Sequence, residues 1–172
     1  MQIKMNNIIC LDFDDCIFPS SAPSSFWESE WSLEQLEINL KRLTKLIYET
    51  KSTIFITSSW YMLFDFYPEE NSVYATNSIK EYWLDYHIDG DISSEEKAYK
   101  LISKYLNGYI SGISCGNRIS DIKELDTSGN RIVVFDDWNL TECNSNNVKC
   151  FDVYGSLNYH ILWKAYNFLK GK

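Results

Sequence analysis

The sequence predicts an α/β fold built around a parallel sheet, and two features of the sequence predict it. Short, unbroken apolar runs recur along the chain, as expected for strands that are buried on both faces. Between these runs lie longer stretches in which the apolar residues follow helical spacing. Strands that alternate with helices are joined by right-handed crossovers, which place helices on the faces of the sheet. We therefore expect a doubly wound arrangement with helices on both faces.

Five apolar runs are the predicted strands. They cover residues 8–11, 54–56, 109–113, 132–135 and 148–151, and the third of them is the weakest. Capping signals mark the predicted helices, since a serine followed three residues later by Glu or Gln forms a capping box. The helices begin near Ser32, running to about Glu49, and then near Ser78, Ser93, Asn117 and Ser156. The stretch 64–77, which contains one proline, is predicted to be a loop.

Length and composition indicate one globular domain, residues 1–172, because no repeat or linker divides the chain. With 45% hydrophobic and 16% aromatic residues, the chain can bury a normal core. The formal net charge of −8 disfavours binding to duplex nucleic acid, whose affinity comes largely from Lys and Arg contacts with phosphates. The same charge leaves open a nucleotide or the end of a strand, which requires only a local site.

The cysteines and the N-terminus indicate a soluble protein of a reducing compartment, which we expect to be cytoplasmic. The cysteines number five and form no CxxC pair, so a disulfide framework and a zinc site are both disfavoured. The two histidines, His87 and His160, are expected to lie on helices as ordinary polar residues. The first ten residues carry no secretory signal, and no apolar stretch approaches the length of a membrane span, so no membrane partner is expected.

Polar residues follow three of the predicted strands, at the point where each strand ends. The residues concerned are Asp12 and Asp14, Thr57, and Asp136 with Asp137. Ligands bind beyond the carboxyl ends of the strands in an open parallel sheet, so these side chains are expected to converge. Converging carboxylates repel one another unless a positive group holds them. Aspartates in this arrangement favour a hard cation such as Mg²⁺, which commonly serves phosphoryl transfer.

At these strand ends the sequence resembles the motifs of the haloacid dehalogenase superfamily. Residues 8–14, IICLDFD, are similar to the first motif, an apolar strand followed by DxD. Residues 54–57, IFIT, are similar to the second motif, which ends in Thr or Ser. Residues 133–137, VVFDD, are similar to the fourth motif in its paired-aspartate form. A DxD sequence alone is a weak signal, but the three motifs occur in the family's order.

This resemblance implies a Mg²⁺-dependent phosphatase with a five-stranded parallel sheet of strand order 5-4-1-2-3. Asp12 would attack phosphorus and form an aspartyl-phosphate. Asp14 would be the general acid/base, and Thr57 would hydrogen-bond the transferring phosphoryl group. Asp12, Asp136 and the backbone carbonyl of Asp14 would bind Mg²⁺, and Asp137 would support the metal directly or through water.

The family's third motif, a basic residue, has three candidates in this chain. Arg118 is preferred, because it starts the predicted helix that leads directly into the fourth strand, where the family usually places this residue. Lys123, on the same predicted helix, is the second candidate. Lys97 is the third, because the predicted strand 109–113 separates it from the fourth strand.

A narrower resemblance is to a small subgroup without a large cap, whose members are associated with RNA repair and phage proteins. It rests on residues 57–60 (TSSW), 118–122 (RISDI) and 136–138 (DDW). The chain departs from that pattern at Asp15, Tyr61 and Asp121, which stand where the subgroup has Gly, Arg and Glu. The intervals between the motifs leave room for at most a minimal cap, which favours a macromolecular end as substrate.

The expected substrate is therefore the phosphate of a nucleotide or of a nucleic-acid end. Ser58, Trp60, Lys123 and Trp138 are candidate substrate-binding residues. The two tryptophans could stack on a base, although a tryptophan more often packs against the protein. Two alternatives stay open: a phosphatase of small metabolites or phosphoproteins, and a binding protein that has this fold but little turnover.

Overall fold

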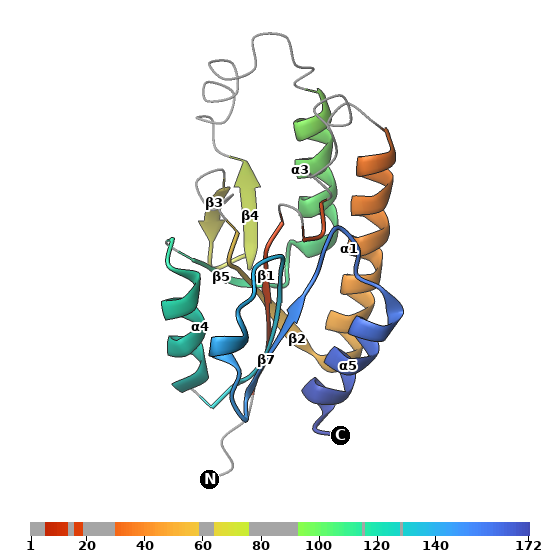
Figure 1. Ribbon diagram of the computed structural model, residues 1–172. Coiled ribbons are helices and arrows are strands. Elements are labelled where there is room, and N and C mark those ends of the chain that lie inside the picture. Colours follow the sequence, from red (N-terminus) through yellow and green to blue (C-terminus); the bar gives the residue numbers. More distant parts are fainter. Residues whose placement is uncertain are drawn as a thin grey trace.

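The computed structural model of the chain describes residues 6–13, 16–18, 30–58, 64–75, 93–114, 116–127 and 129–172. Figure 1 shows its helices and strands, coloured from the N-terminus to the C-terminus. They are β1 (Asn7–Leu11), α1 (Glu30–Thr50), β2 (Ser52–Ile56), β3 (Phe64–Tyr67), β4 (Ser72–Ala75), α3 (Ser93–Leu106), β5 (Ile110–Ile113), α4 (Arg118–Thr127), β6 (Arg131–Asp136), η2 (Thr141–Cys143), β7 (Val148–Asp152) and α5 (Tyr159–Lys170).

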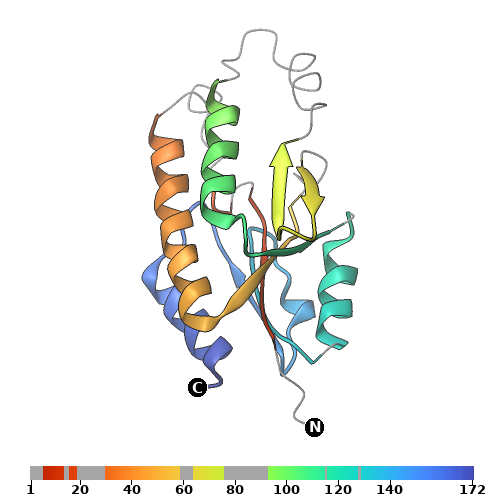
Figure 2. The ribbon, with the colours of Figure 1, turned by 180° about the vertical axis from the view of Figure 1, so that it is seen from behind.

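A five-stranded sheet forms the centre of the molecule, with the strand order β5-β2-β1-β6-β7. Every neighbouring pair of strands in it is parallel. Helices α1, α3 and α5 lie on one side of the sheet and α4 lies on the other (Figures 1 and 2). The predicted α/β class and the five parallel strands are thus confirmed, and each strand coincides with one of the five apolar runs.

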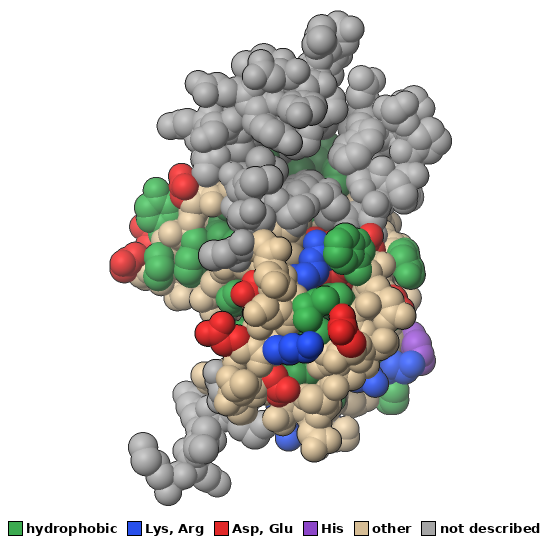
Figure 3. Space-filling model, turned by 60° about the vertical axis from the view of Figure 1, so that its left-hand side comes forward, with side chains coloured by type: hydrophobic (Ala, Val, Ile, Leu, Met, Phe, Trp, Pro, Cys, Tyr) green, Lys and Arg blue, Asp and Glu red, His purple; other side chains and the backbone are tan. Residues whose placement is uncertain are grey.

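The described surface carries charges of both signs. On the face shown in Figure 3, acidic side chains are interspersed with lysine and arginine, and hydrophobic side chains lie between them. Among the described residues, several aromatic side chains are exposed, including those of Trp138, Tyr154, Tyr159 and Trp163. None of the helices in the described part of the chain has both the length and the apolar character needed to cross a membrane.

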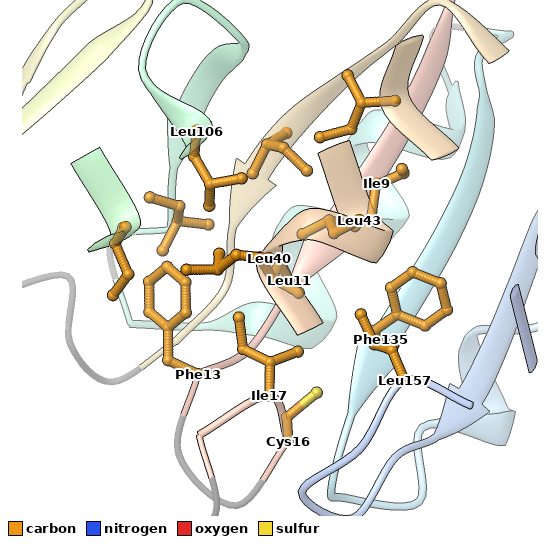
Figure 4. Close-up of a cluster of buried hydrophobic side chains, with 14 of the residues drawn as sticks. Ile9, Leu11, Phe13, Cys16, Ile17, Leu40, Leu43, Leu106, Phe135 and Leu157 are labelled. Carbon is orange, nitrogen blue, oxygen red and sulfur yellow. The ribbon is translucent and has the colours of Figure 1, made fainter. Parts of the chain in front are cut away.

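Alternation along β1 divides the buried side chains between two hydrophobic clusters. Ile9 and Leu11 point to the face covered by α1, where they join Leu40 and Leu43 in the larger cluster (Figure 4). Ile8 and Cys10 belong to the smaller cluster on the other face, which also contains Ile122 of α4. Successive side chains of a strand point to opposite faces, so one buried strand supplies both clusters.

Residues 64–75 form a β-hairpin, and the prediction of a loop over 64–77 is therefore wrong in this part. Strands β3 and β4 pair antiparallel around a turn in which Glu70 N–H donates to the Tyr67 carbonyl at 3.1 Å. Asn71 takes a left-handed backbone conformation, φ 49°, which asparagine tolerates better than most residues. Phe64 is buried against the ring of Phe13, with centroids 6.0 Å apart, so the hairpin lies beside the residue that follows Asp12.

Two helix starts differ from the capping signals, and two agree with them. Helix α1 begins at Glu30, so Ser32 lies inside its first turn. Helix α5 begins after Asn158, whose side chain accepts a hydrogen bond from Ile161 N–H, and Ser156 does not cap it. Asn158 has an extended backbone, φ −75° and ψ 162°, so the helix begins only after it. The N–H of Leu157, just before this cap, donates to the side chain of Asn39 in α1.

The starts of α3 and α4 agree with the prediction. Helix α3 begins at Ser93. Asn117 precedes α4, and its side chain accepts a hydrogen bond from Ser120 N–H at 3.1 Å, as an N-cap residue does. The helix predicted to begin at Ser78 lies outside the described residues.

Gly112 of β5 lies so close to Phe55 of β2 that a side chain there would collide with the ring. A Cβ at position 112 would stand 2.6 Å from the nearest ring atom of Phe55. We expect Gly112→Ala to lower the free energy of unfolding by about 1–3 kcal/mol, as other overpacking substitutions do. Urea unfolding of Gly112→Ala, Phe55→Val and the double variant measures this. The alanine should cost much less in the Phe55→Val background than in the wild-type background, and equal costs would contradict the steric explanation.

Candidate active site

The register of the sheet brings the ends of β1, β2 and β6 together at one edge. Leu11, the last residue of β1, pairs with Ile56 of β2 and with Phe135 of β6. The ladder continues one residue further, since Asp12 N–H donates to the Phe135 carbonyl and Thr57 N–H to the Leu11 carbonyl, both at 3.0 Å. Asp12, Thr57 and Asp136 therefore stand side by side where the strands end, as predicted.

Three carboxylates meet at this edge. Asp12, Asp136 and Asp137 each contribute an oxygen to a cluster in which these atoms lie within 4.8 Å of one another. Asp12 and Asp136 are buried, and Asp137 is partly exposed. Buried like charges repel unless a positive group lies among them. The cluster, made only of carboxylate oxygens, suits a hard divalent cation.

Arg118 is the basic residue that contacts this cluster. Its Nη1 atom lies 2.7 Å from both carboxylate oxygens of Asp136 and 3.6 Å from Oδ2 of Asp12. The side chain of Arg118 is only 15% exposed. Of the other two candidates for the third motif, Lys123 is exposed on α4 and Lys97 is exposed on α3.

The turn between β5 and α4 fixes the backbone of Arg118. Ser114, just after β5, donates its backbone N–H to the Ile56 carbonyl of β2 at 2.7 Å. The hydroxyl of Ser114 donates to the carboxylate of Asp121 on α4 and accepts from the backbone N–H of Gly116. Asp121 thus ties the first turn of α4 to the end of β5.

Trp138 lies beside Arg118 and is 60% exposed. The guanidinium carbon of Arg118 is 4.5 Å from the ring centroid, a cation–π contact. The backbone N–H of Trp138 donates to Oδ1 of Asp136 at 2.9 Å. A core-packing role for Trp138 is excluded by this exposure, and the residue contacts Arg118 through its ring and Asp136 through its backbone.

Two buried oxygen atoms at the site have no hydrogen-bond partner among the described residues. They are Oδ1 of Asp12 and Oγ1 of Thr57, which follow neighbouring strands. An unsatisfied buried polar atom costs about 1–3 kcal/mol, so such a pair at one place indicates that a ligand normally meets them. Ser58, also buried, contributes a side-chain hydrogen bond to Asp12.

Burial, and after it the nearby charge of Asp136, raise the pKa of the Asp12 carboxyl group from 3.8 to about 7. Arg118, the Ser58 hydrogen bond and the Phe13 backbone act in the opposite direction. Burial also raises the pKa of Asp136, although hydrogen bonds from Trp138 and Arg118 oppose this. Arg118 therefore neutralises the cluster only in part.

Several residues that the sequence assigns to the site are not placed. Asp14, Asp15, Trp60 and Tyr61 lie outside the described residues. So does His87, while His160 is exposed on α5. Cys16 is fully buried in the larger hydrophobic cluster, and burial raises the pKa of its thiol, which disfavours the reactive thiolate.

The sequence analysis missed Asn39, a fully buried residue of α1 that supports the site. Its side-chain NH₂ group donates to the carbonyls of Ile17 and Gly155, at 2.7 and 3.0 Å. Its side-chain oxygen accepts from Leu157 N–H at 3.0 Å. Asn39 therefore joins α1 to the segment after Asp12 and to the β7–α5 connection. A signal was present, because an asparagine on the apolar stripe of a helix must find buried partners.

Comparisons with known proteins were made at three levels. The chain matches no protein-family model, no curated protein and no solved structure.

Proposed function

We propose that the chain is a Mg²⁺-dependent phosphomonoester hydrolase of the haloacid dehalogenase type, acting through an aspartyl-phosphate on Asp12. One observation carries the proposal. Asp12, Thr57, Asp136, Asp137 and Arg118 come from four separate segments and meet at one edge of a parallel sheet. A chance cluster of surface acids would not be expected to combine a buried nucleophile candidate, a buried hydroxyl and a partly buried guanidinium.

The reaction would proceed in two displacements at phosphorus. A carboxylate oxygen of Asp12 attacks the phosphorus, and the bond to the leaving oxygen breaks while Asp14 donates it a proton. Water then attacks the same phosphorus and gives a proton to Asp14, which releases inorganic phosphate and restores Asp12. The role of Asp14 comes from the resemblance alone.

The buried polar groups suit a phosphoryl group bound in front of Asp12. The Thr57 hydroxyl, without a partner among the described residues, would donate to a phosphoryl oxygen. The Arg118 guanidinium, 3.6 Å from Asp12, carries positive charge next to the attacked group. Such fixed donors and charges stabilise the negative charge on the transferring group.

The carboxylate cluster fits Mg²⁺ by the chemistry of its donors. Asp12, Asp136 and Asp137 offer oxygen ligands, and Oδ1 of Asp12 is buried with no partner among the described residues. Asp14 would add its backbone carbonyl, as the resemblance implies. A bound Mg²⁺ would supply charge neutralisation for the carboxylates and for the phosphate oxygens.

The strand order and the exposed tryptophan support the finer parts of the proposal. Numbered along the chain, the five parallel strands lie in the order 5-4-1-2-3, which the resemblance implies. Trp138 presents an exposed ring next to Arg118, as a group that stacks on a base would. We therefore propose the phosphate of a nucleotide or of a nucleic-acid end as substrate.

Phosphate release by the purified protein tests the proposal. The substrates are nucleoside monophosphates, 3′- and 5′-phosphorylated oligonucleotides, phosphopeptides and sugar phosphates, each assayed with Mg²⁺ and with chelator. We expect release that requires Mg²⁺ and that is fastest for a substrate carrying a base. Release without metal would contradict the Mg²⁺ assignment. Release that is fastest from sugar phosphates or phosphopeptides would correct the substrate class, and no release from any substrate would favour a binding role.

A further inference from the structure

We infer that Arg118 and a divalent cation are alternative partners of the Asp12–Asp136 carboxylates, and that Trp138 stabilises the arrangement in which Arg118 holds them. Arg118 would therefore be a built-in counter-ion that a metal displaces on binding. The inference deepens the proposed function and rests on it, because it concerns the same cation site.

At Asp136, the contacts of Arg118 use carboxylate oxygens that a metal would also need. Its Nη1 lies 2.7 Å from both oxygens of Asp136, so neither oxygen of this carboxylate is free of the guanidinium. Oδ1 of Asp136 also accepts the Trp138 N–H, which leaves that oxygen with two donors. The same Nη1 lies 3.6 Å from Oδ2 of Asp12, which is the nearer oxygen of the second carboxylate.

A guanidinium and a divalent cation cannot share this position without cost. Mg²⁺ binds carboxylate oxygens at about 2.0–2.1 Å and demands near-octahedral geometry, so at Asp136 it would compete with Arg118 for oxygens that already accept hydrogen bonds from the guanidinium. Two cations on one buried carboxylate also repel each other strongly where water is excluded. Metal binding is therefore expected to include the movement of the Arg118 side chain away from Asp136.

The backbone of Arg118 is fixed, so this movement belongs to the side chain. Asn117 caps the helix start, and the Ser114–Asp121 hydrogen bond ties the same turn to β5. The displaced guanidinium would remain near the phosphoryl group, because its anchor does not move. Arg118 could then act on the substrate once it has left Asp136.

Trp138 affects the competition between Arg118 and a metal through its contact with Arg118, and is thus a positioning residue. Its ring lies 4.5 Å from the guanidinium while Arg118 contacts Asp136, so the ring stabilises the arrangement in which Arg118 contacts this carboxylate. Removing the ring is expected to weaken the hold of Arg118 on Asp136 and to favour the metal. An aromatic replacement should preserve the contact.

Isothermal titration with Mg²⁺ and with Mn²⁺ alone, without substrate, measures the competition. We expect Arg118→Met to bind either metal roughly tenfold more tightly or better, because a hydrogen bond to a charged group no longer has to be broken. Trp138→Leu should bind metal more tightly by a smaller factor, and Trp138→Phe should stay close to wild type. Lys164→Met, at an exposed site on α5, removes the same charge from the chain and should leave the affinity unchanged.

Thermal unfolding with and without Mg²⁺ gives a second test, because a loss of packing alone would not enlarge the rise in Tm that Mg²⁺ causes. In chelator, Arg118→Met should melt below wild type, because the carboxylates lose their counter-ion. With saturating Mg²⁺, the rise in Tm should be larger for Arg118→Met than for wild type, since tighter binding stabilises the folded state more.

Three results would overturn the inference, and they separate it from the proposed function. Equal or weaker metal binding by Arg118→Met, with normal binding by wild type, would show that Arg118 and the metal coexist. If Arg118→Met does not fold, equal affinities of Trp138→Leu and Trp138→Phe would have the same meaning. Absence of metal binding in wild type and in every variant would remove the cation site and the proposed function with it.

Discussion

Asp12→Asn is expected to abolish phosphate release while making the metal-free protein more stable. Turnover should fall by roughly a thousandfold or more, because an amide cannot act as the nucleophile that forms the acyl phosphate. The loss should appear at every substrate concentration, since the nucleophile is needed for the chemical step itself. A rapid-quench assay for covalently bound phosphate measures the same step directly and should find none in the variant.

The gain in stability follows from the position of Asp12. Burial and Asp136 raise its pKa from an ordinary value of 3.8 to about 7, so the ionised form is disfavoured in the folded protein. Above pH 7 the wild-type protein bears the full free-energy cost of the buried charge on Asp12, whereas the uncharged asparagine has no such cost. We expect Asp12→Asn to raise the free energy of unfolding by about 1–3 kcal/mol in chelator at pH 8. The gain should shrink as the pH falls from about 7 toward 3.8, because protonation of Asp12 removes the buried charge from the folded wild-type protein in this range.

Asp152→Asn is the matched control. Asp152 ends β7, pairs in register with Asp136 and is exposed, so its substitution makes the same chemical change outside the cluster. Activity and stability of this control should stay near those of wild type. Retained turnover in Asp12→Asn would refute the aspartyl-phosphate mechanism. A loss of stability in chelator would contradict the electrostatic account of the cluster.

Asn39→Leu is expected to cause the largest loss of stability among these variants, about 3–5 kcal/mol. Leucine is similar in size but leaves the carbonyls of Ile17 and Gly155 and the N–H of Leu157 without the partner that Asn39 provides. Each buried group that loses its partner costs about 1–3 kcal/mol. Urea unfolding with an unchanged m value would measure the loss as a change in stability alone.

The same substitution should impair the site under conditions in which the protein is still folded. Ile17 follows the Asp12–Asp14 segment closely in the chain, so releasing its carbonyl loosens the connection that Asn39 fixes. Gln35→Leu is the control, because among the described residues Gln35 donates one partly buried bond, to Asn39 itself, and its loss should cost under about 1 kcal/mol. Equal effects of the two substitutions would mean that Asn39 is not the centre of this network.

The strands were predictable because their signal is local. A parallel strand is buried on both faces, so its residues form an unbroken apolar run. Residues 132–135, which lie in β6, are such a run. The hairpin of residues 64–75 was missed because its strands are short and half exposed. Contacts with residues distant in the chain, such as those of Phe64 with Phe13 and Tyr99, help to hold it. The start of α5 was predicted two residues early, because Asn158 and not Ser156 is the N-cap residue.

The sequence by itself determined which residues end the strands, and therefore that Asp12, Thr57 and Asp136 would meet at one edge. The carboxyl ends of parallel strands lie at the same edge of a sheet regardless of the loop conformations, so no distances were needed to predict this meeting. Only the tertiary structure decided that Arg118, and neither lysine candidate, contacts the carboxylates, that Trp138 is exposed beside it, and that Asn39 holds Ile17. These facts depend on how a turn, a loop and a helix face are oriented, and contacts between residues far apart in the chain set those orientations.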